Sequence, residues 1–162
     1  MLKAIMAVDD MGGVSKSGSM PWPKNSGDLR WFKQNTINSI VIMGRLTWID
    51  LMMPKPLKDR INILVTNKSP ILYPGADKYI SGDIISQLPD ISKEYKSTPK
   101  WVIGGPNIVN QLFYLIEEFY LTRIYGNYNC DTKLDIKNIE SKMTLYKKIN
   151  NDDTCHFEIW KK

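Results

Sequence analysis

The sequence is poor in the residues that build metal and redox sites. It has a single histidine, His156, and two cysteines, Cys130 and Cys155, among 162 residues. One histidine excludes a metal site built from several imidazoles and argues against a Ser-His-Asp triad. The cysteines are far apart and form no CxxC pair, so we expect reduced, structural thiols and no bound metal.

Long apolar runs and blocks of basic residues are also missing. The first apolar run, residues 2–8, is followed at once by Asp9-Asp10 and is too short for a signal peptide or a membrane span. The net charge of +5 comes from basic residues spread along the chain, which favours a phosphorylated small molecule over a nucleic acid. We therefore expect a cytoplasmic protein with neither a membrane nor a nucleic-acid partner.

What the sequence does contain is an alternation of apolar strands and amphipathic helices. With 43% hydrophobic and 24% charged residues, the chain is typical of one globular domain over residues 1–162. The alternation predicts an α/β sheet covered on both faces. Strands are expected at residues 2–8, 40–43, 61–66, 79–80, 101–103 and 119–125, a terminal hairpin at 145–149 and 157–160, and loops at 9–19, 53–59 and 127–135. Helices are expected at residues 27–36, just after 44, at 83–95, and from 106 with an apolar face of Ile108, Val109, Leu112, Leu115 and Ile116.

The stretch from Met20 to Lys33 places one carboxylate beside large aromatic groups. Two prolines hold Trp22 in an extended turn, and Ser26 or Gly27 is expected to cap a helix that begins near Asp28. Asp28 shares a helix face with Phe32, where lost hydration would raise the pKa of the carboxyl toward values useful for proton transfer. The alternative is an ordinary first-turn acid that faces the positive end of the helix.

Two strands run directly into glycine. Ile40 to Met43 leads to Gly44-Arg45, and Trp101 to Ile103 leads to Gly104-Gly105. Such turns let a ligand approach the backbone and favour phosphate, although simple packing turns would look the same. The full GxGxxG fingerprint is absent, so an ordinary Rossmann assignment is not supported.

Together, these motifs resemble the dihydrofolate reductase family in order and spacing. The resemblance implies a three-layer α/β/α sandwich with a mixed, mostly parallel eight-stranded sheet whose C-terminal strand is antiparallel. It also implies NADPH-dependent reduction of 7,8-dihydrofolate to 5,6,7,8-tetrahydrofolate by a monomer. The segments that carry it are Ala4 to Asp9, Gly13-Val14, Met20-Pro21-Trp22, Asp28 to Lys33, Val41 to Trp48, Val102 to Gly105 and Tyr120 to Ile124.

The resemblance also implies roles for individual residues on the substrate side. Asp28 would bind the pteridine and help protonate N5, with Trp22 and Thr122 holding the water and hydrogen bonds around it. Arg60 would clamp the α-carboxylate of the glutamate tail, a bidentate task suited to arginine. The other implied substrate contacts are Ile5, Met6, Leu29, Phe32, Lys33, Leu51, Leu57 and Ile103.

For the cofactor NADPH, the resemblance implies a second set of contacts. Ala7 and Val14 would meet the nicotinamide, and Lys68 would lie near the adenosine 2′-phosphate. The remaining implied contacts are Met20, Gly44, Arg45, Thr47, Thr66, Asn67, Ile103, Gly104, Gly105, Pro106, Asn107 and Ile108.

The sequence departs from the family pattern at several of these places. Ser15 and Val109 stand where glycine and tyrosine are common, Leu46 replaces a polar or basic residue, and Pro106-Asn107 replaces a turn richer in glycine and arginine. Two other functions remain open: a related reductase of riboflavin synthesis, which Asp28 beside Trp22 argues against, and a non-catalytic folate- or nucleotide-binding module.

Overall fold

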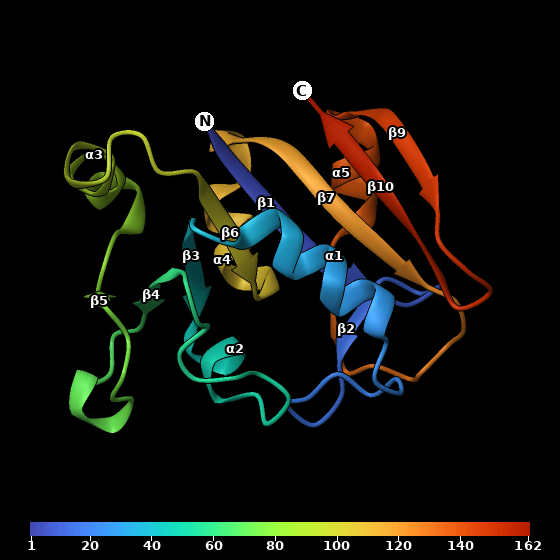
Figure 1. Cartoon of the computed structure of the whole chain (residues 1–162), viewed down its shortest axis with the longest axis horizontal. Coiled ribbons are helices and arrows are strands. Elements are labelled where there is room, and N and C mark those ends of the chain that lie inside the picture. The colour runs from blue at the N-terminus through green and yellow to red at the C-terminus, as the bar shows by residue number, and fades with distance from the viewer.

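A single eight-stranded sheet runs through the molecule (Figure 1). The computed structural model describes residues 1–162. The strand order is β5-β4-β3-β6-β1-β7-β10-β9, and all pairs from β5 to β7 are parallel. β10 is antiparallel to both β7 and β9. The expected mixed sheet with an antiparallel last strand is confirmed. Its strands are β1 (Leu2–Val8), β3 (Ile40–Gly44), β4 (Ile61–Val65), β5 (Lys78–Ile80), β6 (Lys100–Gly104), β7 (Ile116–Ile124), β9 (Thr144–Asn150) and β10 (Cys155–Lys161).

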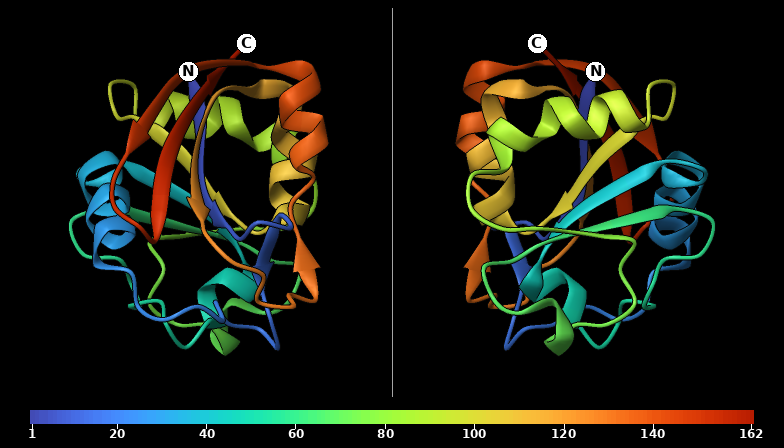
Figure 2. Two further views of the ribbon diagram at one scale, coloured as in Figure 1. Left: turned by 90° about the vertical axis from the view of Figure 1, so that its right-hand side faces the viewer. Right: turned by 90° about the vertical axis from the view of Figure 1, so that its left-hand side faces the viewer.

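Helices cover both faces of this sheet (Figure 2). α1 (Ser26–Thr36) lies on one face, whereas α3 (Ile84–Glu94), α4 (Pro106–Leu112) and α5 (Ile136–Lys142) lie on the other. The short α2 (Arg45–Ile49) follows β3 directly at the carboxyl end of that strand. No helix is long and apolar enough to cross a membrane.

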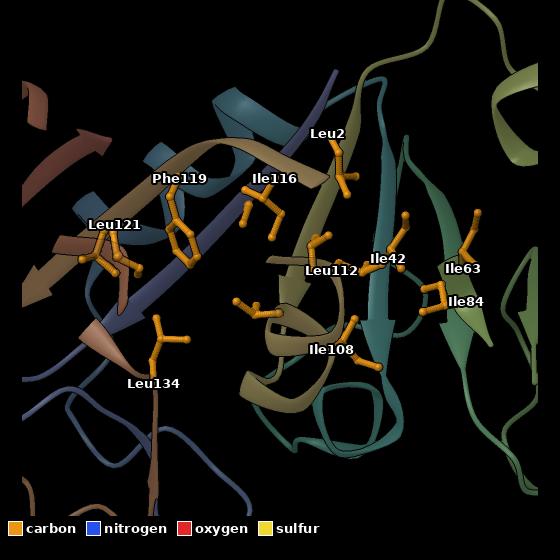
Figure 3. Close-up of a cluster of buried hydrophobic side chains, with 14 of the residues drawn as sticks. Leu2, Ile42, Ile63, Ile84, Ile108, Leu112, Ile116, Phe119, Leu121 and Leu134 are labelled. Carbon is orange, nitrogen blue, oxygen red and sulfur yellow. The ribbon is translucent and has the colours of Figure 1, made fainter. Parts of the chain in front are cut away.

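The two faces are packed by alternate residues of the buried strands. In β3, Ile40 and Ile42 point into the larger cluster, which α3 and α4 cover (Figure 3). Val41 and Met43 point to the other face, into a smaller cluster that Trp48 joins. Three members of this smaller cluster, Ile5, Leu57 and Ile103, also line the candidate site.

Several expectations about local structure were wrong. The helix cap is Asn25, whose side chain accepts a hydrogen bond from Asp28 N, and not Ser26 or Gly27. α4 ends at Leu112, so the expected helical residues Leu115 and Ile116 belong to a 3₁₀ turn, η2 (Phe113–Leu115), and to the start of β7.

Four short elements were not expected. β2 (Gly13–Ser15) lies inside the predicted loop 9–19 and pairs with β8 (Thr132–Lys133) inside the predicted loop 127–135. Neither segment has an alternating pattern, because their pairing depends on contacts distant in sequence. α5 and the 3₁₀ turn η1 (Pro70–Leu72) are also short and weakly patterned.

Candidate active site

A cleft of about 1010 Å³ opens at the carboxyl ends of the central strands. Ligands of open α/β sheets bind at this end because the connecting loops converge there. Residues from β1 and α1 form one wall, and the turns after β3 and β6 form another. The volume is at the upper end of ligand pockets, so it can hold a long molecule or two molecules side by side.

Most of the residues implied by the family resemblance line this cleft. They come from seven separate segments of the sequence, which only the folded sheet brings together. On the substrate side they are Ile5, Met6, Asp28, Leu29, Phe32, Lys33, Leu57, Arg60 and Ile103. On the cofactor side they are Ala7, Val14, Met20, Gly44, Arg45, Thr47, Thr66, Asn67, Lys68, Gly105, Pro106, Asn107 and Ile108.

Four implied residues are not on the cleft surface. Leu51 is 89% exposed and lies outside the cleft, so the structure does not bring it to the site. Trp22 and Thr122 are buried behind the lining. Gly104 has a φ of +128°, and a Cβ there would lie 3.1 Å from Thr47 Oγ1, so this close turn requires glycine.

The structure adds lining residues that sequence reasoning did not assign. Most belong to the loop after α2, which folds over the cleft, and to segments whose position depends on the β2–β8 pairing. The loop is rich in methionine, a signal that could have pointed to an adaptable apolar wall. The added residues are Ser15, Gly18, Leu46, Asp50, Met52, Met53, Pro54, Val65, Gly82, Gln111 and Thr132.

The central polar group of the cleft is the Asp28 carboxylate. Asp28 is only 9% exposed and lines the cleft, and the Thr122 hydroxyl is the one neighbouring group of the chain that acts on its carboxyl. Burial raises the pKa of this carboxyl, and the nearby Thr122 hydroxyl opposes the rise only in part. The desolvated acid expected from the sequence is therefore the better description than a first-turn acid governed by the helix.

The Thr122 hydroxyl behind Asp28 is itself unsatisfied. Thr122 Oγ1 is fully enclosed and has no hydrogen-bond partner in the chain. A buried hydroxyl without a partner costs free energy unless a ligand or a water binds it. Asp28 and Thr122 together therefore form a place where a polar ligand group or water is favoured.

Arg60 is the main cation at the other end of the substrate wall. Its Nη1 donates to Thr36 Oγ1 at 3.1 Å and its Nε donates to Lys58 O at 2.9 Å. The guanidinium lies 5.9 Å from the centre of the Phe32 ring. No acidic side chain is paired with it, so an anionic ligand can be bound at this position.

Comparison with known proteins agrees with this geometry. A family model described as "Dihydrofolate reductase" matches residues 1–162. The chain belongs to the dihydrofolate reductase family. It is 30% identical over 154 residues to a viral dihydrofolate reductase of Saimiriine herpesvirus 2, covering 85% of this chain and 71% of that protein. It is also 30% identical over 149 residues to dihydrofolate reductase type 9 of Escherichia coli, covering 86% and 79%.

A solved structure shows the same fold. The dihydrofolate reductase from Enterococcus faecalis, complexed with NADP(H) and RAB-propyl, aligns with a TM-score of 0.79. The match covers 99% of this chain and 95% of that chain at 23% identity. The three-layer arrangement inferred from the resemblance is thus confirmed.

The structure also explains one departure from the dihydrofolate reductase pattern. Val109, which replaces a common tyrosine, is a residue of α4, is 1% exposed and packs in the large core cluster. It does not line the cleft, so no hydroxyl reaches the site from this position. Ser15, Leu46 and Asn107 do line it.

Proposed function

We propose that this chain catalyses the NADPH-dependent reduction of 7,8-dihydrofolate to 5,6,7,8-tetrahydrofolate, with hydride transferred to C6 and a proton to N5. Tetrahydrofolate would then support thymidylate, purine and one-carbon metabolism. The observation that carries the proposal is the buried Asp28 carboxylate, which faces a large cleft without a partner from the chain. Family membership supports the same reaction.

The cleft residues fit a dinucleotide on the side opposite Asp28. The turns into α2 and α4 are capped by Gly44 and Gly105, and no side chain bonds to the exposed backbone there. These glycines leave the space that a pyrophosphate needs, and Arg45 and Lys68 supply positive charge to hold phosphate. The relative from Enterococcus faecalis is described as a complex with NADP(H), which supports this cofactor.

When bound, NADPH supplies the hydride, so the protein has to position the substrate and control one proton. Asp28 would bind the pteridine edge through charge-assisted hydrogen bonds, and its raised pKa favours retention of a proton near N5. Thr122 Oγ1 would complete the hydrogen bonds around this carboxylate. Trp22 is 7% exposed and would hold the water on the outer side of Asp28.

Apolar side chains would hold the rings and exclude water. Ile5, Phe32, Leu57 and Ile103 line the cleft next to Asp28, where they would contact the pteridine and aminobenzoyl rings. Arg60 would bind the glutamate carboxylate at the far end. Fixing both ends of the substrate lowers the entropic cost of reaching the reactive geometry.

The test is consumption of NADPH by the purified protein, followed at the NADPH absorbance band. Loss of absorbance should depend on dihydrofolate, and methotrexate should inhibit it because its protonated diaminopteridine would pair with Asp28. A folded protein that binds NADPH and dihydrofolate without turnover would instead support the alternative of a non-catalytic folate- or nucleotide-binding module. Activity only with a pyrimidine ribityl or ribosyl phosphate would instead support the riboflavin-pathway reductase.

We also propose that the protein acts as a monomer, since the cleft is built from one chain. Light scattering of the eluted protein checks this. An active dimer that loses activity on dilution would contradict it.

A further inference from the structure

The start of α1 is held by a turn that lies far away in the sequence (Figure 2). Asn25 caps α1, with its Oδ1 accepting from Asp28 N at 3.0 Å. The other end of the same amide, Nδ2, donates to Thr154 Oγ1 at 2.9 Å in the turn between β9 and β10. One side chain thus bonds both to the residue that bears the candidate acid and to a remote turn.

The β9–β10 turn is itself rigidly organised. Asp152 Oδ1 accepts hydrogen bonds from the Thr154 hydroxyl, from Thr154 N at 2.8 Å and from Cys155 N at 3.2 Å. The Thr154 hydroxyl donates to Asp152 while it accepts from Asn25, so its orientation is fixed from both sides. The amide of Asn25 is therefore bound to a fixed partner.

The helix and the turn are also in direct steric contact. A Cβ built on Gly27 would lie 2.5 Å from Asn151 Nδ2, so the side chain of Asn151 packs directly against the helix here. The Cys155 thiol lies 3.8 Å from Asn25 Oδ1 on the inner side of the contact. The hairpin therefore covers one side of the first turn of α1, which bears Asp28.

We propose that Asn25 is a positioning residue for Asp28, holding the first turn of α1 against the β9–β10 turn so that the carboxylate stays desolvated and directed into the cleft. This inference rests on the proposed function for its catalytic consequence. The geometry that carries it, the hydrogen bonds from Asp28 N through Asn25 and Thr154 to Asp152, is independent of any ligand.

Few charged groups influence the pKa of Asp28. No charged group of α1, β7 or β10 contributes to the raised pKa of Asp28, which arises from burial. Burial raises the pKa of the Cys155 thiol on β10, with smaller contributions from the charges of Asp152 and Asp28, so the thiol stays neutral. Near the start of α1 and in the β9–β10 turn, the charged groups are the exposed residues Lys24, Arg30, Lys33, Asp152 and Asp153, of which Lys33 lines the cleft. The charged groups of β7 and β10, together with the titratable His156, are Glu117, Glu118, Arg123, Glu158 and Lys161.

The experiment measures the titration of the Asp28 carboxyl by carbon-13 NMR in the ligand-free protein, with the signal assigned from Asp28→Asn. Asn25→Ala and Thr154→Val should both lower the pKa of Asp28 toward its ordinary value, because the first turn opens to water. Asn25→Asp keeps a good helix cap but adds a negative charge, so it should raise that pKa. In the enzyme assay, Asn25→Ala should lower kcat at neutral pH about tenfold.

The matched control is Asp135→Ala, which removes the cap of α5 by breaking its bond from Asn138 N. It should lower the melting temperature as Asn25→Ala does, without moving the Asp28 titration. The proposal fails if the Asp28 pKa is unchanged in Asn25→Ala and Thr154→Val, or if Asn25→Asp shifts it in the same direction as Asn25→Ala. If Asn25→Ala does not fold, Thr154→Val tests the same connection from an exposed turn.

The titration needs no turnover, which separates this proposal from the proposed function. A wild-type protein that does not oxidise NADPH with dihydrofolate would overturn the function alone. If the wild type is active but the pKa of Asp28 is the same in Asn25→Ala and Thr154→Val as in the wild type, the positioning role alone would be overturned.

Discussion

Two regions of the molecule bury a carboxylate to almost the same extent and treat it in opposite ways. Asp28 in the cleft is 9% exposed, and Glu158 on β10 is 7% exposed. Burial raises the pKa of Asp28. Burial also acts to raise the pKa of Glu158, but hydrogen bonds from His156 and Trp160 and the charge of Arg123 outweigh it and hold that pKa below its ordinary value.

The difference lies in the partners. Glu158 accepts from His156 Nε2 at 2.8 Å, Trp160 Nε1 at 2.9 Å and Arg123 Nε at 3.1 Å. The Asp28 carboxylate has no such bonds, and the Thr122 hydroxyl beside it is also unsatisfied. A buried charge without partners is costly, so a protein that retains one next to a cleft keeps it available for a ligand.

The arginines of the two regions show the same contrast. Arg123 is bound by two carboxylates, those of Glu158 and Glu140. Arg60 donates only to a backbone carbonyl and a hydroxyl, and no acid of the chain pairs with it. The charged groups of the β7–β10 region therefore pair with one another. In the cleft, the Asp28 carboxylate and the Arg60 guanidinium stay unpaired, so a ligand can bind both.

The largest expected effect comes from Asp28→Asn. Without the carboxylate, proton delivery fails, and turnover at neutral pH should fall by about 100-fold or more. At low pH the loss should shrink, because part of the substrate is then already protonated at N5. Steady-state rates across a pH series check this, with Glu158→Gln as the control that keeps wild-type activity. A pH profile of the same shape as the wild type would remove Asp28 from its assigned role.

Glu158→Gln should instead affect stability. A neutral amide loses the charge-assisted bonds to Arg123 and His156, so the free energy of unfolding should fall by about 1–3 kcal/mol in urea titrations. Glu140→Gln removes the exposed partner of the same arginine, and its effect should stay within about 0.5 kcal/mol. If the two variants lost the same free energy of unfolding, the buried hydrogen bonds of Glu158 would contribute no more to stability than the exposed ion pair of Glu140.

This contrast marks the limit of what could be predicted from the sequence. The strands and the two glycine turns are local apolar patterns, and the motif spacing around Asp28 carried the family resemblance. The Arg123 partner of Glu158 could not be predicted, because it comes from β7, whose register against β10 is set by tertiary pairing. The bond from Asn25 to Thr154 could not be predicted for a related reason, because Thr154 lies in the distant β9–β10 turn.

Errors at the cleft have a similar origin. Leu51 was assigned to the substrate by its place in the sequence, but the loop after α2 turns it outward and brings Met52 and Met53 to the cleft instead. Thr132 reaches the cleft because β8 pairs with β2, and neither strand has a pattern of its own. Loop conformation and long-range pairing are not encoded in periodicity.

A smaller effect is expected from Arg60→Lys. Lysine keeps the charge but loses the bidentate geometry, so the Kd for dihydrofolate should rise about tenfold. The Kd for NADPH should not change, since Arg60 lies on the substrate wall. Fluorescence titration with each ligand measures both constants. Arg123→Lys is the matched control and should alter neither, while equal losses for both ligands would contradict the glutamate-tail assignment.

The smallest effect is the pH dependence of stability, where the two carboxylates should act with opposite sign. The pKa of Asp28 is raised above its ordinary value of 3.8, so the stability it contributes is fully present below that pH and is lost as pH rises through the folded pKa. Asp28→Asn should therefore gain stability relative to the wild type at neutral pH, and the gain should vanish in acid.

For Glu158 the sign is reversed. Its pKa is held below the ordinary value of 4.5, so its contribution is present above that pH and is lost as pH falls through the folded pKa. The deficit of Glu158→Gln should thus be largest at neutral pH and shrink in acid, so that the two variants approach the wild type from opposite sides. Urea unfolding over a pH series measures both curves. If both variants differ from the wild type with the same sign, the hydrogen-bond partners do not distinguish the carboxylate of the cleft from that of the β7–β10 region.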